Sequence, residues 1–336
     1  MTTRRSGPWT RWAVTGAATF AAATAVHAAA PSGAEPLREV QRIELPGVEG
    51  RIDHLAIDHE GQRLFVAVLG ADEVDVVDLK VGQRVARLTG FREPQGVAYL
   101  APLRRLLVAA GESGKVFAFE GDKQVGVAAG LADADNVRFF ASTGRLYVGY
   151  GSGLAIIDPM SLAVVARIAL PGHPEAFELA ERGPEIFVNV PTAGRIVVVD
   201  RRDGKTTATW DVGPERRNFP MALDEVGHRL FIGTREPPRL LVYDTTTGRR
   251  VAQSPLCGDV DDVFFDGDKQ QLIAVCGKGT VDVLPWRAGD RLEPAMRVAT
   301  SPGARTGLFV PEARTLYVAA PGRFGHAAAV IAYRLD

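Results

Sequence analysis

A short strand motif recurs along this chain at intervals of 40 to 44 residues. The clear copies read Arg-Leu-Phe-Val-Ala, Arg-Leu-Leu-Val-Ala, Arg-Leu-Tyr-Val-Gly and Arg-Leu-Phe-Ile-Gly. Weaker copies complete a set of seven anchor positions, which are Leu64, Leu106, Leu146, Ile186, Leu230, Leu272 and Leu316. A period of roughly 20–50 residues indicates a repeat architecture in which each copy is one supersecondary unit.

Each anchor has further strands at fixed places around it. A short apolar strand begins nine residues earlier, with its first core position at Leu55, Val97, Val137, Phe177, Met221, Val263 or Gly307. A third strand follows the anchor, as in 74–79 and 196–200, and turns such as Asp203-Gly204 lead to a fourth. The constant offset predicts a tight hairpin, and four strands per repeat are typical of a β-propeller blade.

The seventh repeat ends at Asp336 after three strands. The segment 40–45 carries apolar residues among polar ones and can supply the missing outer strand. Closing the ring in this way hides sheet edges that would otherwise be free to pair with other chains. We therefore predict an all-β fold, with residues 40–336 forming a single seven-bladed β-propeller closed by an N-terminal strand. The alternative is an open solenoid, which needs polar capping repeats that are not visible here.

The cores Leu-Tyr-Val-Gly at 146–149 and Leu-Tyr-Val-Ala at 316–319, with Ile-Val-Val-Val-Asp at 196–200, resemble those of the YVTN-repeat β-propellers. These are bacterial exported proteins, also called the YncE-like family. The resemblance covers about residues 40–336 and implies the fold and export, but it implies no particular activity. This chain departs from the ideal repeat, because the Asn typical of the end of the second strand occurs only as Asn189.

Residues 1–28 have the pattern of a secretory signal peptide. Three arginines precede an apolar, alanine-rich run over residues 12–26, and the segment ends in Val-His-Ala, a small-x-small cleavage pattern. The run is shorter than the roughly 20 apolar residues of a spanning helix, so an uncleaved anchor is the weaker alternative. We expect residues 29–39 to be a flexible leader and the mature protein to be periplasmic or secreted, with no membrane span after cleavage.

The charge of the chain is nearly balanced, with 39 basic and 40 acidic residues. Cleavage removes three arginines and no acid, so 36 basic and 40 acidic residues leave a formal charge of −4. This balance disfavours a nucleic-acid partner, which requires a basic excess or stripe. No Gly-x-Ser-x-Gly, phosphate-loop or Cys-x-x-Cys-His motif is present. We expect a monomer.

Polar residues stand just before the innermost strand of every predicted blade. Because these strands begin at one mouth of the central channel, their preceding residues should converge there, and binding sites favour such concave places. The candidate ligand-binding residues are His54, Gln95, Asp135, Asn136, His173, Glu175, Arg217, Asn218, Asp261, Asp262 and Arg305. The alternative for any one of them is a strand cap or the lining of a water-filled channel.

Three functions fit such a mouth. The first is an extracytoplasmic binding or scaffold protein that recognises a small ligand, a metal or a protein partner, and we prefer it. The second is a lactonase- or lyase-type enzyme, in which a His or Glu acts as base while Arg217 or Arg305 holds an acidic substrate. The third is a redox-associated accessory protein, although the chain has no haem motif. Separately, His54, His173 and His326 could form a metal site for Zn, Cu or Fe at the mouth. The sequence specifies no cofactor.

Cys257 and Cys276 are the only cysteines of the chain. Export would place them where disulfides persist. Cys257 precedes the first strand of the sixth repeat and Cys276 ends its second strand, so both should lie at the mouth. We predict a disulfide between them; two free thiols and a thiolate metal site are the alternatives.

Overall fold

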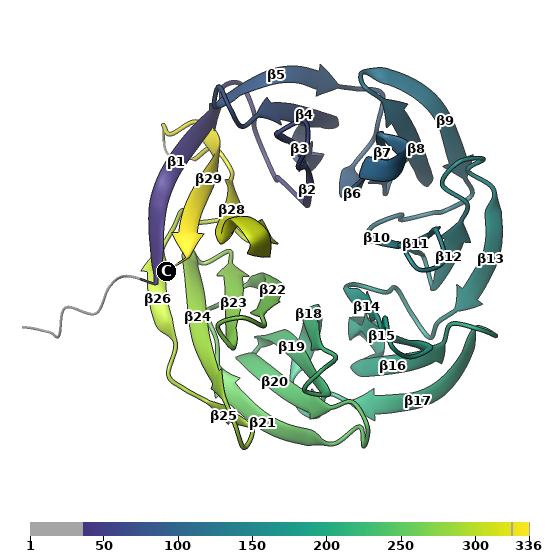
Figure 1. Cartoon of the computed structure of the whole chain (residues 1–336), viewed down its shortest axis with the longest axis vertical. Helices are drawn as coiled ribbons and strands as arrows, with labels where there is room; N and C mark the ends of the chain where they lie inside the picture. Colours follow the sequence, from purple (N-terminus) through teal and green to yellow (C-terminus); the bar gives the residue numbers. More distant parts are fainter. Residues whose placement is uncertain (1–35, 324, 336) are drawn as a thin grey trace, which may run out of the picture. The chain divides into compact units, whose positions relative to one another are not determined.

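The computed structural model describes residues 36–323 and 325–335. The predicted signal peptide and residues 29–35 of the predicted leader therefore lie outside the described residues. Seven antiparallel sheets follow one another around a ring (Figure 1), which confirms the predicted all-β, seven-bladed propeller. No helix in the described ranges is long and apolar enough to cross a membrane.

Six blades have their strands in sequence order from the axis of the ring outward, and in the seventh the N-terminal strand takes the outer place. The innermost strands are β2 (Leu55–Asp58), β6 (Pro94–Leu100), β10 (Val137–Phe140), β14 (Phe177–Leu179), β18 (Arg216–Asp224), β22 (Val260–Asp266) and β27 (Thr306–Val310). The second strands are β3 (Arg63–Val68), β7 (Arg105–Ala110), β11 (Arg145–Tyr150), β15 (Glu185–Val190), β19 (Arg229–Glu236), β23 (Gln271–Cys276) and β28 (Thr315–Ala320).

The third strands are β4 (Glu73–Asp78), β8 (Lys115–Glu120), β12 (Gly153–Ile157), β16 (Arg195–Asp200), β20 (Pro238–Asp244), β24 (Thr280–Arg287) and β29 (Ala328–Leu335). The outer strands are β5 (Gln83–Leu88), β9 (Lys123–Ala129), β13 (Val164–Ala169), β17 (Lys205–Asp211), β21 (Arg250–Pro255), the pair β25 (Arg291–Leu292) and β26 (Met296–Ala299), and β1 (Leu37–Leu45). Short 3-10 turns occupy η1 (Leu69–Ala71), η2 (Ala101–Leu103), η3 (Pro191–Ala193) and η4 (Pro311–Ala313).

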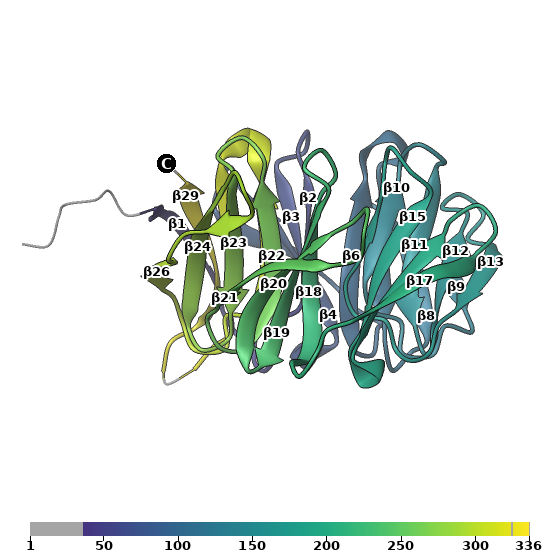
Figure 2. The ribbon, with the colours of Figure 1, turned by 90° about the horizontal axis from the view of Figure 1, so that it is seen from below.

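The predicted hairpins are present in every blade. The first core position of the inner strand pairs with the residue two places after the anchor, as in Leu55 with Val66 and Phe177 with Val188. This register is the same around the ring because the turn between the two strands keeps one length. Figure 2 shows the strands running between the two faces of the ring.

The core lies between neighbouring blades. One buried cluster, for example, joins Leu107 and Ala109 of blade two to Leu146 and Val148 of blade three. The seven anchors are at most 2% exposed. Burying aliphatic and aromatic side chains of this size is the main stabilising contribution to such a ring.

The N-terminal strand closes the ring as predicted. Strand β1 pairs antiparallel with β29 and completes the seventh sheet, in the order β1-β29-β28-β27. It begins at Leu37 and not at residue 40, so the prediction of a leader through residue 39 was wrong at its end. Leu37 is 1% exposed and packs into the core, and a register shift between Glu39 and Gln41 breaks the alternation that would have revealed it.

The predicted disulfide is present. Cys257 and Cys276 are bonded, with their Cα atoms 5.8 Å apart, and both are buried. Val260 pairs with Cys276 across β22 and β23, so the bond ties the loop before β22 to the adjacent hairpin.

Candidate functional site in the central channel

Three cavities follow one another along the channel and share lining residues. The outer cavity, at the mouth, has a volume of about 340 Å³, the middle cavity about 70 Å³ and the inner cavity about 260 Å³. Arg51, Asp135 and Glu175 line both the outer and the middle cavity. His54, Arg138 and Glu178 line both the middle and the inner cavity. The three cavities therefore form one stack.

One residue of each blade, two places before the first core position, forms a ring at the mouth. We call Asp53, Gln95, Asp135, Glu175, Phe219, Asp261 and Arg305 the mouth ring, and all seven line the outer or the middle cavity. The backbone explains their common position: the N–H groups of Asp53, Asp135 and Glu175 donate to the carbonyls of Ala67, Gly149 and Asn189. The hairpin ladder thus continues beyond the strand and holds these residues in equivalent places.

Arginines surround the carboxylates of the mouth. Arg51 forms an ion pair with Asp53 at 2.8 Å, and Arg305 forms one with Asp259 at 3.2 Å. Arg235 pairs with Asp261, and its guanidinium carbon lies 4.1 Å from the centroid of the Phe219 ring. Arg217 pairs at 3.1 Å with Glu236, and both of these side chains are more than half exposed. The first three pairs are partly buried, so they fix the shape of the mouth more firmly than the fourth.

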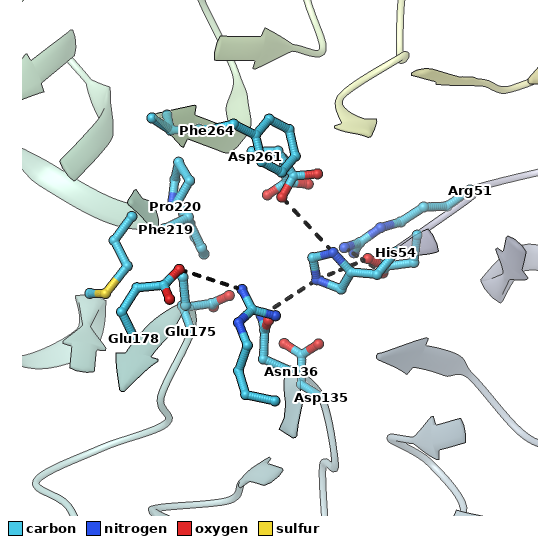
Figure 3. Close-up of a pocket in the computed structure, with 16 residues that line it drawn as sticks. Arg51, His54, Asp135, Asn136, Glu175, Glu178, Phe219, Pro220, Asp261 and Phe264 are labelled. Atoms are coloured by element: carbon cyan, nitrogen blue, oxygen red, sulfur yellow. Dashed lines mark hydrogen bonds and ion pairs between the residues drawn. The ribbon is translucent and has the colours of Figure 1, made fainter. Parts of the chain in front are cut away.

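His54 lies at the centre of the middle cavity (Figure 3). Its Nε2 is 3.7 Å from Asp53 and 3.4 Å from the Asn136 amide nitrogen, and its Nδ1 is 4.0 Å from Asp262. Burial lowers the pKa of His54, but the neighbouring Asp53 and Asp262 carboxylates outweigh burial and raise it. The N–H group of the Asn136 amide that faces Nε2 needs this nitrogen to carry no proton, so the amide and the carboxylates favour opposite protonation states of His54.

Glu175 is a carboxyl of the channel with a strongly raised pKa. Burial, reinforced by the Asp135 carboxylate, raises the pKa of Glu175 to about 8. Among the described residues it has no ion-pair or hydrogen-bond partner for its side chain. Burial also raises the pKa of Asp53, Asp261 and Asp262. Glu175 thus holds a proton near neutral pH, and a protonated carboxyl can donate a hydrogen bond or a proton.

This shift predicts a pH-dependent stability. Because the folded pKa of Glu175 exceeds its unfolded value, the folded protein holds a proton that the unfolded chain has lost, and stability falls as pH rises toward 8. We expect Glu175→Gln to be more stable than the wild type at pH 9 by about 1–3 kcal/mol and equal to it at pH 4. Urea unfolding at both pH values measures the difference, with exposed Glu60→Gln as control. If the wild type and Glu175→Gln differ in stability by the same amount at pH 9 and at pH 4, the raised pKa of Glu175 is contradicted.

Most predicted ligand-binding residues line the stacked cavities. Seven are in the outer cavity, namely Gln95, Asp135, His173, Glu175, Arg217, Asp261 and Arg305, and His54, Asn136 and Asp262 are in the cavities below. His173 lies 3.1 Å from Asp133 and 3.8 Å from Asp135. Its pKa is raised, first by the interaction with the Asp135 carboxylate.

Two sequence-based placements were wrong. Asn218 is fully buried and outside the channel, because a register shift between β18 and β19 turns it into the blade. Its amide donates to Asn189 Oδ1 at 3.0 Å and to the Arg195 carbonyl at 3.1 Å. His326 lies in a separate cavity with Arg42 and Ser301, so it does not meet His54. The described part of the chain has no group of three metal-binding side chains.

Sequence reasoning missed the second ring of the channel. Arg138, Glu178 and Phe264 line the middle and inner cavities, and Leu308 lines the inner cavity. Each stands one residue after the first core position of its blade. Since side chains alternate along a strand, the residue after a core position faces the opposite side, here the channel. That alternation was readable in the sequence.

The fold and its cavities define a seven-bladed β-propeller with a polar, charged channel. A solved structure titled Kuenenia stuttgartiensis hydrazine synthase is similar, with a TM-score of 0.72 over 87% of this chain and 99% of that chain. At 15% sequence identity this similarity shows the fold alone. No family model and no curated protein sequence matches the chain.

Proposed function

We propose that this chain is an extracytoplasmic binding protein that takes a small molecule carrying an anionic group into the outer cavity. The observation that carries the proposal is the convergence of Arg51, Arg217 and Arg305 on that cavity from three blades. Their side chains remain 46%, 51% and 26% exposed. Guanidinium groups present a planar fork of donors that suits carboxylate and phosphate oxygens.

The dimensions of the site favour a small molecule. A volume of about 340 Å³ lies at the lower end of the range for small-molecule pockets, roughly 300–1,000 Å³. The lining is contributed by separate blades, which are rigid elements, and such elements hold binding groups more firmly than loops do.

The proposed location is the periplasm or the cell exterior. The buried disulfide supports it, because disulfides persist in oxidising compartments. The YVTN-type repeat cores of the sequence agree with export, and we include membership of that exported group in the proposal.

Arg217→Ala tests this binding site. We expect it to weaken ligand binding about 10- to 150-fold, because a charge-assisted hydrogen bond contributes roughly 1.5–3 kcal/mol. Stability should hardly change, since the Arg217–Glu236 pair is exposed. Titration of the purified protein with sugar acids, hydroxy acids and amino acids measures binding, with Arg202→Ala, 76% exposed and paired with Asp200, as the matched control. Equal losses of binding and stability would mean a structural role.

A catalytic function is the second candidate, and Glu175 supports it. Its pKa of about 8 suits a general acid, and His173 with the Asp135 carboxylate lies beside it in the outer cavity. This arrangement agrees with a lactonase- or lyase-type reaction on an acidic small molecule. Incubation with sugar lactones and uronates tests this function. Turnover by the wild type that Glu175→Gln abolishes would support catalysis. Binding without turnover would support the binding function alone.

A further inference from the structure

We propose that the ligand is a small zwitterion, with its carboxylate held by the outer-cavity arginines and its ammonium group held by the carboxylates and the Asn136 carbonyl oxygen below them. This inference rests on the proposed binding function and names the chemical class of its ligand. It follows from the separation of charge in the channel, from unpaired acceptors, and from the continuity of the two cavities.

Charges in the outer cavity are sorted by blade. Arg217, Arg305 and Arg51 come from blades five, seven and one, whereas Asp135 and Glu175 come from blades three and four. Asp261 of blade six also lies on the arginine side, where it pairs with Arg235 of blade five. One side of the mouth is therefore rich in guanidinium groups and the other in carboxyl groups. A molecule with a single anionic group would use only the first side.

The middle cavity is rich in carboxyl groups. Six of them, Asp53, Asp135, Glu175, Glu178, Asp261 and Asp262, face three basic side chains, Arg51, Arg138 and His54. The two arginines pair with Asp53 at 2.8 Å and with Glu178 at 4.0 Å. Asp135 has only His173 beside it, at 3.8 Å, and Glu175 has no ion-pair partner within the described ranges, so a cationic group would meet an unpaired carboxyl group there.

Buried acceptors without donors point to the same place. Asn136 is 5% exposed, its amide nitrogen contacts His54, and its Oδ1 has no hydrogen-bond partner. Asp261 Oδ1 accepts from Arg235, while Asp261 Oδ2 is buried and unpartnered. A buried acceptor without a hydrogen-bond partner destabilises the folded protein, so these atoms favour a group that only donates. An ammonium group has three donors and no acceptor.

The two cavities share enough lining for one small molecule to contact both. Arg51, Asp135, Glu175, Phe219 and Asp261 line the outer and the middle cavity alike. The middle cavity, at about 70 Å³, has room for a group of ammonium size but not for a sugar ring. The bulk of the ligand then lies in the outer cavity, beside the arginines.

Calorimetric titration with matched probes tests this inference. The probes are the protein amino acids, the carboxylic acids that lack their α-amino group, and the amines that lack their α-carboxylate. We expect at least one amino acid to bind, and its matched acid and amine to bind at least tenfold more weakly. An acid that binds as tightly as its amino acid would overturn the zwitterion while leaving the proposed function intact. If no amino acid and no carboxylic acid binds, both the zwitterion inference and the proposed binding function are overturned.

Two variants separate the ends of the ligand. Asn136→Leu, which is close to the wild type in size, should weaken binding of the amino acid but not of its matched acid. Arg217→Ala should weaken the binding of both by the same factor. Binding near pH 7 should also release about one proton from Glu175, because a nearby cation favours its ionised form. Binding heats in buffers of different ionisation enthalpy measure this release, which Glu175→Gln should abolish. Asn136→Leu that folds and keeps the wild-type preference for the amino acid would contradict the proposed ammonium position.

Discussion

Removal of residues 37–45 should abolish the single cooperative unfolding transition of the ring. Strand β1 is the outer strand of the seventh blade, and its pairing with β29 joins the two ends of the propeller. Without it, the edge of β29 is exposed and Leu37, Ile43 and Leu45 leave the core. We expect broad unfolding at lower urea concentration, followed by fluorescence and circular dichroism. A deletion variant with wild-type cooperativity would show that β1 does not close the ring.

A pair of point substitutions in β1 gives a graded form of this test. Ile43 is 1% exposed, and Val40 in the same strand is 47% exposed. Ile43→Ala should lower the free energy of unfolding by roughly 2–5 kcal/mol, because it leaves a cavity in the core. Val40→Ala should change it by less than about 0.5 kcal/mol. Similar losses for both would mean that core packing by β1 is not the cause.

Replacement of both cysteines by alanine should lower the free energy of unfolding by about 3 kcal/mol. The bond joins residues 19 apart in sequence. It stabilises the folded protein mainly because it restricts the conformations of the unfolded chain. Urea unfolding of the wild type with and without reductant, beside the double variant, measures the effect. Reductant should destabilise only the wild type. Alkylation of both cysteines in unreduced mature protein would show that the bond does not form.

The same substitution should weaken ligand binding. The disulfide holds the segment that carries Asp259 and Asp261, and these carboxylates position Arg305 and Arg235 at the mouth. Without the disulfide this segment can move, and the arginines that it positions should no longer keep one arrangement in the outer cavity. If the cysteine double variant keeps the wild-type affinity, the groups that bind the ligand lie on other blades and this prediction is wrong.

The architecture was readable from the sequence because the signal is repeated. Leu64 and its six counterparts occupy equivalent core positions, and the tight turn before them keeps the hairpin register constant. Irregularities in the backbone were not readable. The bulge in β1 hid the strand position of Leu37, and the register shift in β18 buried Asn218, which its spacing had placed in the channel.

The candidate site was predicted in outline for the same reason. Residues two places before each core position converge wherever the hairpin ladder is regular, as at Asp135 and Glu175. Which charges pair and which remain unpaired depends on side-chain positions across blades. The unpartnered Asn136 Oδ1 and the raised pKa of Glu175 are properties of that assembly, and no local pattern in the sequence encodes them.

A crystal structure of the protein soaked with its tightest-binding amino acid or hydroxy acid is the most direct test of the proposed site. We expect density in the outer cavity, in contact with Arg217 and Arg51 and reaching toward Glu175. Density confined to the groove lined by Phe187, Leu223 and His228, with the channel lining unchanged, would contradict the site.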